Sequence, residues 1–512
     1  MPRTEQPAIG SYALIGDTRS AALCSAEGAI DWLCIPRFDS EPVFSRLVAG
    51  ERGGSFSVRP RNGRPAGRGY LPGSAVLETS WRADGSELSV TDGMVVDVEG
   101  ALLPRLVLVR RLEARGAPIE VDIVFDPRRG LPGRAPDRVA RRGTTVVSSW
   151  GSLAVAITTD ADARLQPGTA EHVTVDPSRP VTLAMTVAHR EPLVLVEPEA
   201  AYRMLRRTDE AWRNWSQRLD YGGLRPSTVE RSLVTLRLLT YSPSGAAVAA
   251  PTTSLPEAIG AGRNWDYRYS WPRDSSLGIE AFLGVGRSEE PQTYLHWLLH
   301  ASRITRPRVR VLYSLDGRPG SEEVEADVPG YRGSRPVRLG NGASDQHQLD
   351  VYGWGLRAAA TMEARGERLD GETWRAMADL ADFVASRWRD PDAGIWERRG
   401  SPAHHVHSKL MAWLALDRAL RIASSRRVRR RRVSRWSEAR EAITAEVRRK
   451  GWDDDAGAYV AAFGDRSLDA AVLVPLVEWE DRGSPRFAST VDAIASRLSA
   501  GRPLLYRYAP ET

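Results

Sequence analysis

Apolar and polar residues alternate along the first part of the chain in a pattern that is typical of β-strands. The segments LVLVRRL (106–112) and IEVDIVFD (119–126) alternate in this way on either side of a turn, so we predict that they pair as a hairpin. The pattern continues in TTVVSSW (144–150) and LAVAITT (153–159), and glycine, proline and aspartate residues separate these segments. Many short strands at regular spacing predict an N-terminal antiparallel β-sandwich over residues 1–196.

From about residue 197 the apolar residues recur at helical spacing instead. The segment 197–221 predicts a connecting helix, and we assign residues 197–226 as a helical linker. Further helices are predicted at 227–241, 274–285, 289–303, 345–362, 371–388, 405–423, 436–450, 467–478 and 487–499. Helix after helix without intervening strands predicts a bundle, a solenoid or a helical toroid over residues 227–512. The absence of a repeat of about 20–50 residues counts against a simple solenoid.

The composition is that of an ordinary globular protein. Of the 512 residues, 42% are hydrophobic and 27% are charged, and no apolar run approaches the roughly 18 residues that a membrane span requires. The N-terminal residues lack the features of a signal peptide. The two cysteines, Cys24 and Cys34, provide no disulfide framework. We therefore predict a cytoplasmic protein without a membrane partner, and leave open whether it forms a homo-oligomer.

The excess positive charge is concentrated in one short segment. The formal net charge is +6, and the run RRVRRRRVSR (426–435) contributes seven arginines. Such a run is able to bind nucleic acid, but no aromatic stacking platform accompanies it. Because the helical pattern resumes at residue 436, we interpret the run as a solvated insertion between two helices and predict no nucleic-acid partner.

Three loops of the helical part combine aromatic, acidic and arginine side chains. The loop 262–276 holds four aromatic residues, three arginines and two acids within fifteen positions. The segments 327–353 and 394–413 have a similar character. Aromatic rings pack on the apolar face of a sugar, while carboxylates and guanidinium groups bind its hydroxyls. The loops therefore indicate a carbohydrate site, in which Arg273 and Asp274 are suited to clamp adjacent hydroxyls.

Other chemistries have weaker support in the sequence. The motif HHVH (404–407) suggests a metal, but neither an HExxH motif nor a cysteine pair accompanies it. A GxSxG nucleophile motif and a phosphate-binding Walker loop are also absent from the sequence. We predict neither a metal nor a cofactor.

The loops also resemble a known family, glycoside hydrolase family 15, which contains glucoamylases and bacterial trehalases. The resemblance rests on IGDTRSAALCSAEGAIDWLCIPRFDS (15–40), AAPTTSLPE (249–257), NWDYRYSWPRD (264–274), PVRLGNGASDQHQLDVYG (336–353), GIWERRG (394–400), HSKLMAWLALDRAL (407–420) and GWDDDAGAYVAAFGDRSLDAAVLVPLV (451–477). These motifs occur in one order and cover nearly the whole chain. The resemblance implies an N-terminal β-sandwich, a helical linker and an (α/α)6 toroid that forms the catalytic domain.

The same resemblance implies roles for particular residues. The glutamate of the family's WE motif is the general acid and corresponds to Glu397. The residues that correspond to the glucose-binding subsite and its walls are Tyr267, Trp271, Arg273, Asp274, Arg335, Trp396 and Arg398. The family inverts the anomeric configuration, which requires a general acid and a general base about 6.5–9.5 Å apart.

The family's general base is a glutamate in a GEEGAF-like motif, which follows the element matched here by LLYRY (504–508). The sequence ends at Thr512 before such a motif. We therefore expect a toroid that lacks its last helices and the general base.

Two functions remain open from the sequence. The first is an inverting glycoside hydrolase that releases glucose from trehalose or from α-linked gluco-oligosaccharides, and the predicted cytoplasmic location favours trehalose. The alternative is a catalytically impaired or non-catalytic homologue that binds a glucan or disaccharide. For the enzyme, we predict that Trp396 shields Glu397 from water and that the pKa of Glu397 is raised.

Overall fold

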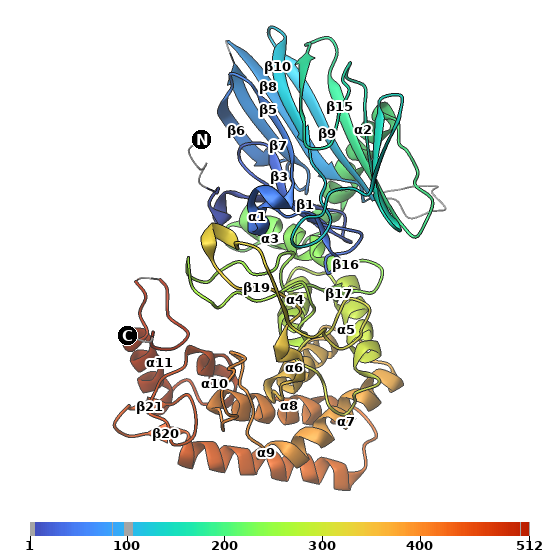
Figure 1. Cartoon of the computed structure of the whole chain (residues 1–512). Coiled ribbons are helices and arrows are strands. Elements are labelled where there is room, and N and C mark those ends of the chain that lie inside the picture. Colours follow the sequence, from blue (N-terminus) through green and yellow to red (C-terminus); the bar gives the residue numbers. More distant parts are fainter. Residues whose placement is uncertain (1–5, 84, 97–105, 502, 511–512) are drawn as a thin grey trace. The chain divides into compact units, whose positions relative to one another are not determined.

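The computed structural model describes residues 6–83, 85–96, 106–501 and 503–510. The chain forms two compact units (Figure 1). The first comprises Met1–Tyr269 and Glu322–Asn341, and the second comprises Ser270–Ser321 and Gly342–Thr512. The predicted domain boundaries after residues 196 and 226 both fall inside the first unit and stay a prediction.

Two antiparallel sheets make up most of the first unit. The seven-stranded sheet has the order β1 (Ala13–Gly16), β2 (Ala21–Cys24), β3 (Ala29–Cys34), β5 (Phe56–Pro60), β10 (Ile119–Phe125) and β14 (Ala170–Val175), with β4 (Pro42–Phe44) paired to β3. The eight-stranded sheet has the order β11 (Arg138–Arg142), β12 (Thr145–Trp150), β13 (Leu153–Thr159), β15 (Val181–His189), β9 (Leu106–Arg115), β8 (Ser86–Met94), β7 (Leu77–Ala83) and β6 (Arg64–Tyr70). Ile30 and Val121 of the first sheet share one apolar core with Leu108 and Leu183 of the second. The predicted antiparallel β-sandwich is therefore confirmed.

The predicted hairpin between 106–112 and 119–126 is wrong. Strand β9 pairs with β8 and β15 in the eight-stranded sheet, whereas β10 pairs with β5 and β14 in the seven-stranded sheet. The chain crosses from one sheet to the other near Gly116, whose φ is 95°. The apolar residues of a strand show that it packs against a core, but they do not choose the strand's partner.

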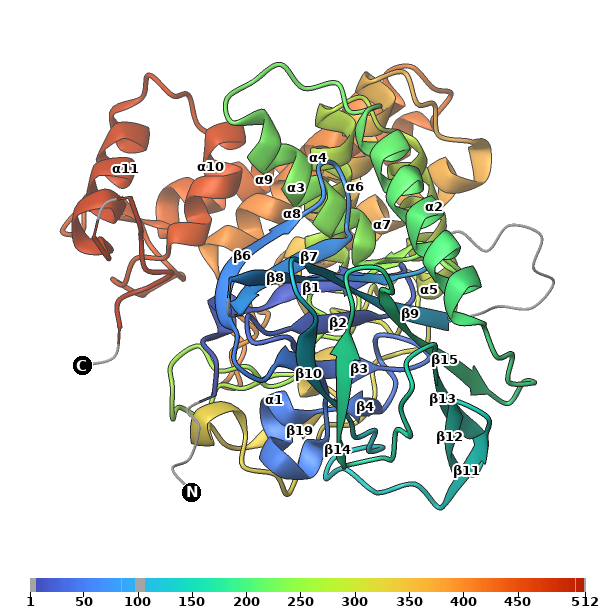
Figure 2. The same cartoon turned by 90° about the horizontal axis from the view of Figure 1, so that it is seen from above.

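Helix α2 (Pro198–Ser216) packs on the outer face of the eight-stranded sheet, as Figure 2 shows. Ala201 and Leu205 of the helix contact Val107 and Val109 of β9. Because the core covers one face of β9 and α2 covers the other, most of the strand is buried on both sides. The first unit also contains α1 (Arg46–Ala49), α3 (Pro226–Leu238) and two short strand pairs, β16 (Thr240–Tyr241) with β17 (Ala246–Ala247) and β18 (Val324–Ala326) with β19 (Val337–Leu339).

The second unit is built of paired helices. They are α4 (Pro272–Gly284), α5 (Glu289–Ser302), α6 (Asp350–Ala364), α7 (Gly371–Arg387), α8 (Val406–Ala423), α9 (Arg430–Lys450), α10 (Leu473–Trp479) and α11 (Pro485–Arg497), with a strand pair β20 (Trp452–Asp453) and β21 (Ala458–Tyr459) before α10. Helices α4, α6, α8 and α10 contact one another in succession, and α5, α7 and α9 form a second row against them. This double row agrees with the helical domain that the sequence predicts.

The arginine run is part of a helix rather than an insertion between two helices, so that interpretation is wrong for its second half. Helix α9 begins at Arg430, and Arg432 lies 2.6 Å from a carboxylate oxygen of Asp379 and 2.8 Å from one of Asp382. Both acids belong to α7, so part of the charge of the run is neutralised by the neighbouring helix. In the described part of the chain, no helix is long and apolar enough to cross a membrane.

Candidate active site

Glu397 lies in the loop between α7 and α8 and has an unusual backbone conformation. Its φ is 54°, in the left-handed region that residues with a Cβ rarely adopt. Such a conformation costs on the order of 1–3 kcal/mol and persists only where surrounding contacts hold it. The Nε2 group of Gln346 supplies such contacts, because it donates to the backbone carbonyls of Glu397 (3.3 Å) and Arg398 (3.2 Å).

The carboxylate of Glu397 is mostly buried beside one indole and one guanidinium group. Nε1 of Trp271 donates to Oε1 of Glu397 at 2.8 Å, and Nη1 of Arg273 lies 3.5 Å from the same oxygen. The Glu397 side chain is 19% exposed. Burial raises the pKa of Glu397, and this effect outweighs the lowering by Arg273 and Trp271. The direction agrees with the prediction from sequence and suits a group that must hold a proton.

Arg273 connects the start of α4 to the loop that carries Glu397. Its Nη1 donates to the carbonyl of Ile395 at 3.0 Å, and its Nε donates to Oδ2 of Asp274 at 3.1 Å. Asp274, in the first turn of α4, is 40% exposed, whereas Arg273 is 18% exposed. Arg273 and Asp274 therefore form an ion pair in which the Asp274 carboxylate is partly exposed, and their predicted role as a clamp on sugar hydroxyls stays a prediction.

Trp396 and Arg398 turn toward other partners. The indole Nε1 of Trp396 donates to both carboxylate oxygens of Asp469, at 3.0 and 2.9 Å. The guanidinium of Arg398 lies 5.0 Å from the ring centre of Tyr508. The indole that donates to the Glu397 carboxylate is thus that of Trp271, whereas the indole N–H of the adjacent Trp396 is bonded to Asp469.

Tyr267 and Arg335 belong to the first unit, and the other six predicted site residues belong to the second. The carbonyl of Tyr267 accepts a hydrogen bond from the backbone of Ala250. Arg335 is more than half exposed and donates to Asp327 at 2.7 Å and to the carbonyl of Val328 at 3.0 Å. Asp327 and Val328 come from the same loop, so these contacts help fix that loop.

Further titratable groups lie in the second unit near Arg273. Asp350, in the first turn of α6, is buried, and its pKa is raised to about 6 although Arg273 opposes the shift. His407, in the first turn of α8, is also buried, and burial lowers its pKa to about 3, so the imidazole is neutral. Within the described ranges, no three His, Cys, Asp or Glu side chains are grouped so that they could hold a metal ion. The site therefore offers acid–base chemistry with charged and aromatic groups around it.

Gln346 and Asp469 were not predicted as site residues from the sequence. Both contact the loop that carries Glu397 from positions far along the chain, Gln346 through two carbonyls and Asp469 through Trp396. Gln346 lies in the motif 336–353 and Asp469 in the motif 451–477, so the resemblance included both segments without distinguishing these residues.

Two family models together match most of the chain. The family described as glycosyl hydrolases family 15 matches residues 223–511, and the family described as trehalase-like, N-terminal matches residues 3–206. A trehalase of Thermoplasma volcanium is 32% identical over 508 residues, which cover 98% of this chain and 81% of that protein. A trehalase of Mycolicibacterium smegmatis is 33% identical over 539 residues, with 99% of this chain and 79% of that protein covered.

Among solved structures, a bacterial glucoamylase complexed with acarbose is similar in fold. The TM-score is 0.71 and the alignment covers 98% of this chain and 81% of that chain, at 12% sequence identity. This likeness supports the fold alone, whereas the family match and the two trehalases rest on sequence. On that evidence the chain belongs to glycosyl hydrolases family 15 and is a glycoside hydrolase.

Proposed function

We propose that this glycoside hydrolase acts on trehalose, inverts the configuration at the attacked carbon, and uses Glu397 as its general acid. The observation that carries the proposal is the environment of Glu397, whose carboxylate is buried with a raised pKa beside Trp271 and Arg273. A carboxylic acid whose pKa is raised by burial keeps its proton to higher pH, which suits it to protonate a glycosidic oxygen.

The choice of trehalose rests on the relatives. The sequence relatives at 32% and 33% identity are named trehalases, and they align over nearly the whole chain. The glucoamylase is similar at only 12% identity, so it gives little support for maltose or another glucan. The cytoplasmic location predicted from the sequence also favours trehalose, and both the location and the substrate stay proposals.

In the proposed reaction, Glu397 gives its proton to the bridging oxygen as the bond to the first glucose breaks. In inverting glycoside hydrolases a water molecule, activated by a second carboxylate about 6.5–9.5 Å from the acid, attacks the freed carbon from the opposite face. None of the residues described above is assigned as this second carboxylate. Trp271 and Arg273 then stabilise the carboxylate that Glu397 becomes, because both donors point at its Oε1. Burial favours the protonated form of Glu397 before the step, and the two donors favour the ionised form that the step produces.

The remaining predicted residues have the chemistry to bind sugar hydroxyls and rings. Asp274 is accessible beside Arg273 and accepts from hydroxyls. Tyr267, Trp396, Arg335 and Arg398 are proposed as further substrate contacts from the family resemblance. Each of these roles predicts a higher KM when the side chain is truncated.

The test is hydrolysis of trehalose, maltose and isomaltose by the purified chain, followed by proton NMR of the released glucose. Inversion of trehalose gives one β-glucose from the attacked half and one α-glucose from the leaving half, so both anomers appear together at early times. A retaining reaction would give only α-glucose at first. The control is Glu397→Gln, for which we expect a loss of roughly 10²–10⁴ in kcat.

The alternative function, binding without turnover, gives a different result. Trehalose would bind in calorimetry to both the unchanged chain and the Glu397→Gln variant, and neither would release glucose. If glucose appears at the same rate with both forms, the assignment of Glu397 is wrong.

A further inference from the structure

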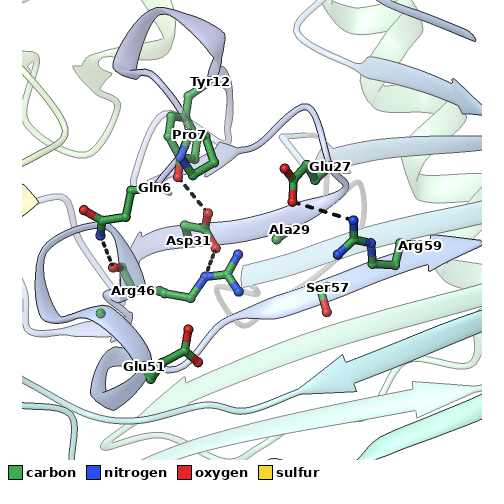
Figure 3. A pocket seen from close by; sticks show the side chains of 11 residues that line it. Gln6, Pro7, Tyr12, Glu27, Ala29, Asp31, Arg46, Glu51, Ser57 and Arg59 are labelled. Carbon is green, nitrogen blue, oxygen red and sulfur yellow. Dashed lines mark hydrogen bonds and ion pairs between the residues drawn. The ribbon is translucent and has the colours of Figure 1, made fainter. Parts of the chain in front are cut away.

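A pocket of about 140 Å³ opens on the outer face of the seven-stranded sheet, within the first unit (Figure 3). Ser57 and Arg59 line it from β5, whose alternate residues Phe56 and Val58 face the sandwich core. Tyr12, Glu27, Asp31, Arg46 and Glu51 also line it. None of these residues contributes to the site around Glu397.

Asp31 forms the buried floor of the pocket. Its side chain is 1% exposed, Oδ1 lies 2.8 Å from Nε of Arg46, and Oδ2 accepts from the hydroxyl of Tyr12 at 2.7 Å. These bonds hold a phenol and a guanidinium in fixed positions around one carboxylate. Figure 3 shows the Arg46 guanidinium extending from the wall toward the middle of the pocket.

The rim adds two acids and a second arginine. Glu27 and Arg59 approach to 3.7 Å, and both side chains are more than half exposed. Glu51 lies close enough to Arg46 for its charge to raise the pKa of that guanidinium further. The rim side chains are therefore accessible to solvent and to a bound molecule, whereas Asp31 is held in place by its bonds to Arg46 and Tyr12.

The charges of the lining exclude two kinds of ligand. Three carboxylates face two guanidinium groups, so the lining carries a net charge of −1 and repels anions. In the part of the chain that the structure describes, these carboxylates are not grouped as metal ligands, and Asp31 and Glu27 are already paired with arginines. A neutral ligand whose groups both donate and accept hydrogen bonds fits this lining best, because carboxylates and guanidinium groups alternate around it.

The volume limits the size of that ligand. Pockets for drug-sized molecules hold roughly 300–1,000 Å³, so about 140 Å³ is suited to one ring with its hydroxyls. The aromatic ring of Tyr12 in the lining offers a surface for the apolar face of such a ring. These properties together describe a single sugar unit.

We propose that this pocket is a second, non-catalytic binding site for one hexose unit, either free glucose or the end of a longer saccharide. The choice of a sugar among polyhydroxylated molecules rests on the proposed function. The location and the lining chemistry do not depend on it.

The experiment measures the number of glucose molecules bound per chain by equilibrium dialysis with radiolabelled glucose. It uses the full chain with Glu397→Gln, so that the same preparation can be tested with trehalose and maltotetraose without turnover. We expect two glucose molecules per chain, and one after Ser57→Trp fills the pocket. Thr174→Trp is the matched control, because Thr174 is exposed on the same face of the sheet outside the pocket, and it should leave the number at two.

A second variant guards against misfolding of Ser57→Trp. Glu51→Ala removes an exposed side chain and should weaken glucose binding at the pocket at least fivefold. Binding that both variants leave unchanged would overturn the proposal, as would methylammonium or inorganic phosphate binding in the pocket where glucose does not. A chain that binds one glucose, lost with Ser57→Trp, would support the pocket and contradict the proposed catalytic site, so the two failures are distinguishable.

Maltotetraose separates the two sources of a hexose unit. If the pocket takes the end of a longer saccharide, Ser57→Trp lowers the number of maltotetraose molecules bound per chain by one. If it takes only free glucose, that number does not change, while the number of glucose molecules still falls.

Discussion

The indole Nε1 of Trp271 lies 2.8 Å from Oε1 of Glu397, although 126 positions separate the two residues in the sequence. Trp271 is the residue directly before α4 and is 1% exposed, so its ring is fixed by packing. The bond favours the ionised form of Glu397 while burial favours the protonated form. Together with the charge of Arg273, which also favours the ionised form, this bond opposes the effect of burial on the pKa of the proposed acid.

Trp271→Phe should move the alkaline limb of the pH–rate profile to higher pH. The general acid must be protonated, and the substitution removes a donor that lowers the pKa of Glu397. A hydrogen bond to a charged group contributes roughly 1.5–3 kcal/mol, so we expect a shift of about 1–2 pH units with a fall in kcat. The measurement is kcat for trehalose between pH 4 and about 9.

Trp452→Phe is the matched control for that variant. Trp452 also donates its indole N–H to a carboxylate, that of Asp454 at 2.8 Å, but in the β20 hairpin. Its loss should leave the alkaline limb in place. If the alkaline limb of the pH–rate profile does not move in Trp271→Phe, the bond from Trp271 does not lower the pKa of Glu397.

Asp469→Ala should lower kcat strongly and lower the free energy of unfolding only slightly. Asp469 accepts from Trp396, the residue before Glu397, and also from the backbone N–H of Ala471. Loss of the bond to Ala471 costs about 1 kcal/mol, whereas displacement of the Glu397 loop by about 1 Å is expected to cost roughly 10²-fold in rate. Because Asp469 acts through Trp396, the position of the alkaline limb should move little.

The control is Asp481→Ala, since Asp481 also accepts from a backbone N–H but lies in an exposed turn. Its kcat should equal that of the unchanged chain. Asp469→Asn keeps one acceptor oxygen and should recover part of the activity. A rate for Asp469→Ala equal to that of Asp481→Ala would contradict the positioning role.

Local patterns predicted the helices well and the partners poorly. Helix α8 was expected at 405–423 and spans Val406–Ala423. Its apolar residues recur at helical spacing whichever neighbouring element buries them, so the pattern alone predicts the helix. The pairing of β9 was predicted wrongly, because a strand that buries both faces carries no information about which neighbour bonds to it.

In the candidate site, too, residues that are adjacent in sequence were predicted and contacts between distant segments were not. The motif around Glu397 predicted the proposed acid together with the adjacent Trp396 and Arg398, because these residues are contiguous in sequence. It could not show that the indole bonded to the acid would be Trp271, since the fold of α4 against the α7–α8 loop decides that contact. Asp469 and Gln346 carry no local signal, because a carboxylate or amide that holds a distant loop looks like any other polar residue.

Glu397→Gly should be more stable than Glu397→Ala, although glycine usually destabilises. The φ of 54° at this position costs alanine roughly 1–2 kcal/mol and costs glycine almost nothing. We expect the thermal midpoint of the glycine variant to lie above that of the alanine variant. Equal midpoints would mean that the backbone relaxes when the carboxylate is removed.

Glu397→Gln should stabilise the fold at high pH but not at low pH. The pKa of Glu397 is raised in the folded protein above its ordinary value of 4.5, so its contribution to stability is fully present below that value. The contribution is lost as the pH rises through the folded pKa, where the buried carboxylate ionises. Glutamine avoids this loss, so the thermal midpoints should agree near pH 4 and differ by about 2–4 °C near pH 8 if the cost is about 1 kcal/mol. A difference that does not change with pH would contradict the raised pKa.

Arg110→Met should destabilise the first unit by about 3–5 kcal/mol, because it leaves Asp92 buried without its partner. Arg110 is fully buried, and its Nε lies 2.8 Å from Oδ1 of Asp92, the residue opposite it on β8. It also donates to the carbonyls of Phe56 and Gly28 in the other sheet, both at 2.8 Å, so it joins the two halves of the sandwich.

The double variant Arg110→Met/Asp92→Leu removes the unpaired charge and should recover part of the lost stability, measured by thermal unfolding. Glu199→Ala, which breaks a pair with Arg203 that is more than half exposed on both sides, should cost less than about 1 kcal/mol. If the double variant is no more stable than Arg110→Met, the two carbonyl bonds rather than the ion pair account for the effect.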